Sequence, residues 1–157
     1  MTHPTDLQPR RRALGLPVLG LIGLAALGVP RVILHDLGLI EENGLVTWLL
    51  ALLPIAAWIV VAVAAKVPNP FLTVLVIGTI FGVMLVVTHQ LLWVPAFDGN
   101  PPALGDGPLA SLIPRVAAMT SGLFTGAIMG AIAGLVAWGI RALVNRSASP
   151  SGDGAAT

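Results

Sequence analysis

The sequence predicts an all-α membrane protein, a four-helix transmembrane bundle with both termini in the cytoplasm. Of its 157 residues, 56% are hydrophobic and only 10% are charged, whereas soluble domains average about 25% charged residues. The apolar residues gather in four runs, each close to the roughly 20 residues that cross a ~30 Å hydrocarbon core. The last run carries a glycine ladder at four-residue spacing, which is typical of helices that pack closely in lipid.

The first apolar run is interrupted only by Arg31. It follows residues 1–12, a polar segment that ends in three arginines and is predicted to be a disordered cytoplasmic tail. A basic segment before an apolar run also occurs in secretory signal peptides, including the twin-arginine type. This run is longer than a usual signal core, and no clear cleavage site follows it. We therefore expect an uncleaved first helix.

The second run has no charge and carries Pro54 at its middle. A proline there removes one backbone hydrogen bond and clashes with the preceding turn, so we expect a kink. Asn43 is expected to cap the start of this helix. In the connection to the third run, Asn69 suits an N-cap and Pro70 the first helical position.

The fourth run follows the longest loop, residues 96–113, which is rich in proline and glycine. Leu109–Ile113 is expected to form one helical turn, ended by Pro114. The helix after it should be about 37 Å long and should tilt or protrude. Residues 145–157 are predicted to be a second disordered cytoplasmic tail, which leaves a transmembrane domain at residues 13–144. The expected spans are residues 13–34, 45–65, 71–94 and 116–140.

The charges that flank the four runs are distributed unevenly. With four spans, the two connections on one side hold five acidic residues, offset by two arginines. The other side holds Arg10, Arg11, Arg12, Lys66, Arg141 and Arg146. The positive-inside rule then places both termini in the cytoplasm of a cell (inner) membrane. Seven arginines against one lysine, with abundant alanine and glycine, indicate a GC-rich bacterial genome.

The glycine ladder of the fourth run is expected to be the packing spine of the bundle. Residues four apart on a helix lie nearly above one another, so small residues at this spacing form a groove without side chains. The third run offers Gly78 and Gly82 as a matching surface. We expect this contact to form within one chain, with packing between chains of a homo-oligomer as the alternative. The ladder consists of Ala118, Gly122, Gly126, Gly130 and Gly134.

Several polar residues are expected at a similar depth near the outer ends of three helices. They are Arg31, His35, His89, Gln90 and Arg115. Polar groups at membrane depth are costly and should face the bundle or water. In one interpretation the arginines reach the interface and pair with loop carboxylates, while His89 bonds a backbone carbonyl. In a second, His35 and His89 bind a metal or haem. In a third, the acidic loops form a vestibule for an ion or small solute, with His89 as a titrating gate.

The sequence carries no motif of a common enzyme class. It has no cysteine, no Gly-x-Ser-x-Gly or His-Glu-x-x-His motif, and no phosphate or dinucleotide loop. A net charge of +1 without a basic patch excludes a broad nucleic-acid surface. We expect no catalysis and no cofactor.

Three function classes remain. The first is a non-enzymatic accessory or scaffold subunit that acts through helix packing in the lipid bilayer, as a homo-oligomer or with another membrane subunit. The second is a small transporter or channel component that works as a homo-oligomer with an acidic outer vestibule. The third is a haem- or metal-binding redox bundle that uses His35 and His89.

Overall fold

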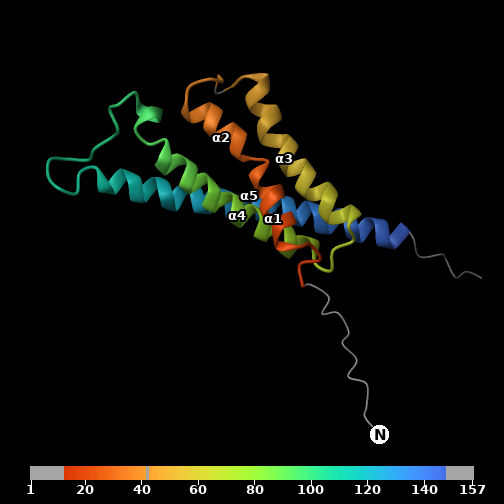
Figure 1. Cartoon of the computed structure of the whole chain (residues 1–157). Helices are drawn as coiled ribbons and strands as arrows, with labels where there is room; N and C mark the ends of the chain where they lie inside the picture. Colours follow the sequence, from red (N-terminus) through yellow and green to blue (C-terminus); the bar gives the residue numbers. More distant parts are fainter. Residues whose placement is uncertain (1–12, 42, 148–157) are drawn as a thin grey trace, which may run out of the picture.

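The computed structural model describes residues 13–41 and 43–147, and this part of the chain is helical without a strand. Four helical stretches are long and apolar enough to cross a membrane. Figure 1 shows their arrangement. The helices are α1 (Val18–Ala26), α2 (Val29–Asp36), α3 (Leu45–Ala64), α4 (Pro70–Leu91) and α5 (Leu112–Ser147), with a short 3-10 turn at Pro95–Phe97. The tails expected at residues 1–12 and 148–157 lie outside the described residues.

The first candidate span is two helices, α1 and α2, and not the single helix expected over residues 13–34. Pro30 lies at the start of α2 and explains the break, since its ring lacks an N–H and would clash with the carbonyl of Ala26. Gly28 occupies the break, and the Phe81 ring of α4 packs directly against it. A Cβ at Gly28 would lie 2.5 Å from Cε2 of that ring.

Trp58 of α3 stabilises the same break by a hydrogen bond to the end of α1. Its indole Nε1 donates a 2.7 Å hydrogen bond to the carbonyl of Leu24, near the end of α1. The same carbonyl also accepts a longer, 3.3 Å bond from the amide of Leu27. The indole therefore supplies the shorter of its two bonds, at a helix end where the regular helical bond is missing. Trp58 is fully buried.

The caps of α3 and α4 differ in how well the sequence predicts them. The Asn69 cap of α4 is confirmed, because its side chain accepts a 3.0 Å bond from the amide of Leu72. The Asn43 cap of α3 is wrong, since Gly44 occupies that position and no side chain bonds the helix start. The nearby Thr47 hydroxyl donates to the carbonyl of Glu41, which ties the connection to the first turn of α3.

The fourth span extends beyond the expected residues 116–140 at both ends. Pro114 does not end a separate turn but lies in the first turn of α5, where its missing N–H leaves no helical bond unmade. At the other end the helix continues through residues 145–147, which were expected in the disordered tail. At 1.5 Å per residue, α5 is about 54 Å long.

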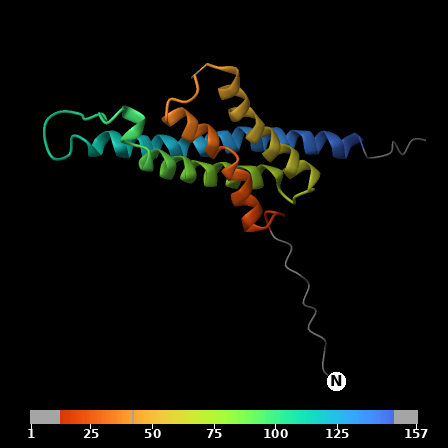
Figure 2. The same cartoon turned by 45° about the horizontal axis from the view of Figure 1, so that its top comes forward.

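Helices α4 and α5 run antiparallel and lie side by side in both views, and the other helices cover one side of this pair (Figures 1 and 2). The contact is made at backbone level. A Cβ on Gly78 would lie 2.6 Å from the carbonyl oxygen of Gly126, and one on Gly134 would lie 2.8 Å from that of Phe71. Gly82 faces Gly126 in the same way. Side chains at these positions would force the helices apart.

Helix α4 is the centre of the bundle, because it contacts α1, α2, α3 and α5 and makes the most extensive contact of any pair of helices, with α5. The described core gathers around it. Its buried apolar members are Leu21, Ala25, Val32, Trp58, Ala62, Val67, Val74, Ile77, Phe81, Ala133 and Ala137. This packing sets the ends of α2 and α4 beside each other, where the candidate site lies.

Candidate functional site

Asp36 is the centre of the polar site. It is the last residue of α2, and its side chain is only 3% exposed. His89 lies in the last turn of α4, and its Nδ1 is 2.7 Å from Oδ2 of Asp36. With the carboxylate ionised, the imidazole Nδ1–H donates to it, in a charge-assisted hydrogen bond. The pair joins two helices that are 53 residues apart in sequence.

His35 approaches the same carboxylate from the neighbouring position. Its Nδ1 is 3.4 Å from Oδ1 of Asp36, a long and weak contact. The side chain of His35 is 42% exposed and that of His89 is 32% exposed. One buried carboxylate therefore lies between two accessible imidazoles.

Trp93 connects His89 to Arg115. The Trp93 ring meets the His89 ring edge to face at 6.0 Å, and the guanidinium carbon of Arg115 lies 5.3 Å from the Trp93 ring centre. Phe97 packs on Trp93 at 5.1 Å. A cation above an indole face is held by the negative charge of the ring face. Arg115 thus interacts with an aromatic ring, and the structure shows no loop carboxylate bound to it among the described residues.

The structure brings together only part of the polar cluster expected from the sequence. His35, His89 and Arg115 meet around Asp36 and Trp93, as described above. His89 bonds Asp36, and not the backbone carbonyl of the first interpretation. Gln90 makes no hydrogen bond to these residues, and its buried Nε2 has no hydrogen-bond partner in the described chain. Arg31 lies apart, in a cavity between α2, α3, α4 and α5.

A shallow hollow adjoins His89 on the side of α5. Ala118 and Gly122 of the small-residue stripe line it, and Gly122 also packs closely against α4. A Cβ on Gly122 would lie 2.9 Å from Cγ2 of Val86. The residues that line the hollow are Leu85, Val86, His89, Ala118, Ser121, Gly122 and Thr125. Ala118, the first member of the ladder, therefore borders the hollow.

The arrangement of the histidines bears on the metal hypothesis. Both rings direct Nδ1 toward one carboxylate, which leaves Nε2 of each ring as the free nitrogen. Within the described residues, no three His, Asp or Glu side chains converge where they could hold a metal ion. The geometry is that of two imidazoles hydrogen-bonded to a carboxylate.

Sequence reasoning missed the two residues that organise the site. Asp36 is one of the five acidic residues assigned to the connections between spans, although it directly follows His35 at the end of an apolar run. Trp93, near the end of the third span, has no role in the sequence-based interpretations. An acid that ends an apolar run, with a histidine near the end of another, is the signal that could have identified this pair.

Within residues 13–41 and 43–147, the fold and site together define a helical protein with four helical stretches apolar enough to cross a membrane and a buried carboxylate bonded to an imidazole where α2 and α4 end. Comparison with known proteins adds no relative: no family model, curated protein or solved structure matches the chain.

Proposed function

We propose that this chain is a four-span protein of a bacterial cell (inner) membrane, with both termini cytoplasmic, that acts without catalysis as an accessory or scaffold subunit. Its partners are the lipid bilayer and either further copies of itself or another membrane subunit. The positive-inside distribution of basic residues supports the orientation. The shape of α5 supports the scaffold role.

The observation that carries this proposal is the length of α5 relative to the bundle. Ala137 is the last fully buried residue of this helix, which continues through residues 138–147, about 15 Å further. Trp138, Leu143 and Val144 are all more than half exposed on this extension. An apolar helical extension beside two arginines is suited to a second helix or to the membrane interface.

Native mass spectrometry of the gently solubilised protein tests the scaffold role. We expect a defined complex, either with copies of this chain or with another polypeptide. The double variant Leu143→Glu and Val144→Glu should release the partner, whereas Leu104→Glu, in the long loop, should not. A bare monomer in the wild-type protein would contradict the proposal.

Cysteine labelling tests the orientation. Because the native sequence has no cysteine, each introduced cysteine is the single reactive thiol. Single cysteines at Leu39 or Leu104 should react with a membrane-impermeant thiol reagent in intact cells. Cysteines at Lys66 or Ser147 should react only after the cells are opened. The reverse pattern would contradict the proposed orientation.

A second candidate function is a transporter or channel component, and the Asp36–His89 pair favours it. A buried carboxylate bonded to an accessible imidazole beside a hollow is a suitable binding point for a proton or cation. This function needs a homo-oligomer, because four helices rarely enclose a pore. A proteoliposome flux that is lost in His89→Ala, together with an oligomer in native mass spectrometry, would support it. The redox alternative, with His35 and His89 as ligands, has no such favouring observation.

A further inference from the structure

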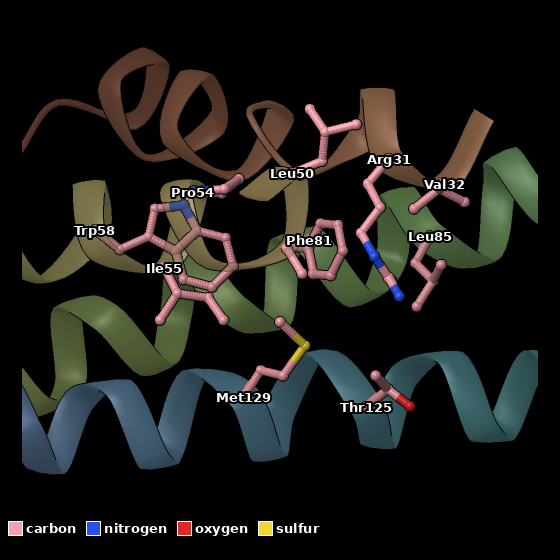
Figure 3. A pocket seen from close by; sticks show the side chains of 12 residues that line it. Arg31, Val32, Leu50, Pro54, Ile55, Trp58, Phe81, Leu85, Thr125 and Met129 are labelled. Carbon is pink, nitrogen blue, oxygen red and sulfur yellow. The ribbon is translucent and has the colours of Figure 1, made fainter. Parts of the chain in front are cut away.

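Arg31 extends from α2 into a cavity inside the bundle. Figure 3 shows its guanidinium running past Leu85 of α4 toward Thr125 of α5. The sequence suggested that this side chain reaches the interface to meet loop carboxylates. In the structure it instead turns inward, between helices that should be surrounded by lipid. The residues that line the cavity are Gly28, Arg31, Val32, Leu50, Ala51, Pro54, Ile55, Trp58, Phe81, Leu85, Thr125 and Met129.

The guanidinium lacks a counter-charge in this position. Its Nε is buried without a hydrogen-bond partner, and no carboxylate of the described residues forms an ion pair with it. A cation in a low-dielectric interior is destabilising unless an anion and hydrogen bonds compensate it. Apart from Arg31 and Thr125, the side chains around the cavity are apolar. The bundle therefore offers one cation and one hydroxyl to a group that it does not itself supply.

The shape of the cavity limits what that group can be. Its volume is about 50 Å³, and since one water needs roughly 10–15 Å³ by this measure, it holds a compact group and not a whole amphiphile. A guanidinium presents parallel N–H donors that match the two oxygens of a carboxylate or phosphate. Thr125 lines the same cavity and carries a further donor, although its hydroxyl points away from the guanidinium in Figure 3.

The remainder of such a ligand must be apolar. Thr125 is exposed, so the cavity opens along α5, and Leu85 and Thr125 also line the hollow beside His89. Small residues of α5 line that hollow, where an acyl chain could lie against the helix.

We propose that Arg31 and Thr125 form an intramembrane binding site for the anionic group of a single-chain or lipid amphiphile. The carboxylate or phosphate oxygens pair with the guanidinium of Arg31, and the apolar chain leaves past Leu85. Rotation about the Cα–Cβ bond of Thr125 lets its hydroxyl donate to the same group. The site is independent of the scaffold role, because it uses the interior of the bundle and not the extension of α5.

Thermal unfolding in nonionic detergent micelles tests the site, with laurate as the anionic probe and methyl laurate as its uncharged counterpart. Laurate should raise the unfolding temperature of the wild-type protein by about 5 °C near saturation, and methyl laurate should not. Arg31→Met keeps the side-chain length but removes the cation. We expect this variant to be at least as stable as the wild type without ligand, and to lose the response to laurate.

Two further variants make the result specific. Arg115→Met removes a guanidinium that lies over Trp93, outside the cavity, and should respond to laurate like the wild type. Thr125→Val keeps the side-chain shape and should weaken laurate binding about tenfold. This variant also keeps the proposal testable if Arg31→Met fails to fold.

Lipid vesicles distinguish the two sources of the anion. The same proteins are reconstituted in phosphatidylcholine with and without phosphatidylglycerol. Stabilisation by laurate alone identifies a free carboxylate, and stabilisation by phosphatidylglycerol that requires Arg31 identifies a lipid headgroup. Both results support the site. Stabilisation of Arg31→Met to the same extent as the wild type, an equal effect of methyl laurate, or no response to either anion would overturn it.

Discussion

The carboxylate of Asp36 at the end of α2 and the imidazole of His89 at the end of α4 are joined by a 2.7 Å contact. This contact links the end of the broken first helical stretch to α4, the central helix of the bundle. Asp36 is almost fully covered, so it depends on its histidine partners to compensate its charge.

Removal of His89 should therefore destabilise the protein. His89→Ala leaves Asp36 with only the long contact to His35, and we expect the free energy of unfolding to fall by about 1–3 kcal/mol. His89→Asn places an amide donor near the position of Nδ1 and should recover part of the loss. Equilibrium unfolding in mixed detergent micelles measures both variants. If Asp36→Asn is combined with His89→Ala, the two effects should add incompletely, and full additivity would show that the side chains do not interact.

The contact between α4 and α5 predicts strong sensitivity to one methyl group. A Cβ on Gly126 would lie 2.5 Å from the carbonyl oxygen of Gly78, so Gly126→Ala must separate the helices. We expect a loss of about 1–3 kcal/mol in unfolding free energy, and a greater loss for Gly126→Leu.

Gly139 on the same helix provides the matched control. A Cβ there meets no atom within 4 Å, so Gly139→Ala should be neutral or stabilising by up to about 1 kcal/mol. Equal effects at the two positions would mean that helix propensity, and not backbone contact, governs the response.

Trp58 should stabilise the break in the first span through its hydrogen bond. Trp58→Phe removes the donor to the Leu24 carbonyl and reduces the volume that packs on Phe81 at 5.8 Å. We expect a loss of about 1–2 kcal/mol, with faster hydrogen exchange at the amides near Gly28. Trp138→Phe, which alters a tryptophan that is 57% exposed, should change stability by less than about 0.5 kcal/mol. Unchanged exchange near Gly28 in Trp58→Phe would argue against the role of the indole bond.

The helical class, the four apolar stretches and the Asn69 cap could be predicted because each depends on neighbouring residues. The break at Gly28 could have been predicted as well, since Pro30 is a local signal, but the continuous apolar character of residues 13–34 was given more weight. For Pro114 the local signal is misleading. A proline in the first turn of a helix costs no hydrogen bond, so its effect depends on where the helix begins, and the structure shows that α5 begins at Leu112.

The candidate site was predicted in its residue types but not in its contacts. His35, His89 and Arg115 were expected at one depth, yet their partners, Asp36 and Trp93, depend on how α2 and α4 rotate against each other. The direction of Arg31 was also beyond the sequence, because a long side chain near a helix end can turn outward or inward. The rotation of α2 against α4, and with it the direction of Arg31, follows from the packing of Gly28 against Phe81.

The sequence by itself determined that the protein is helical, apolar enough for a membrane, and equipped with glycine surfaces on its last two spans, because composition and periodicity are local properties of the chain. Tertiary structure alone decided that these glycines meet within one chain, that His89 reaches Asp36, and that Arg31 enters a cavity. Each of these depends on pairing residues far apart in sequence, and many pairings satisfy the same apolar pattern until backbone contact at the glycines fixes one register.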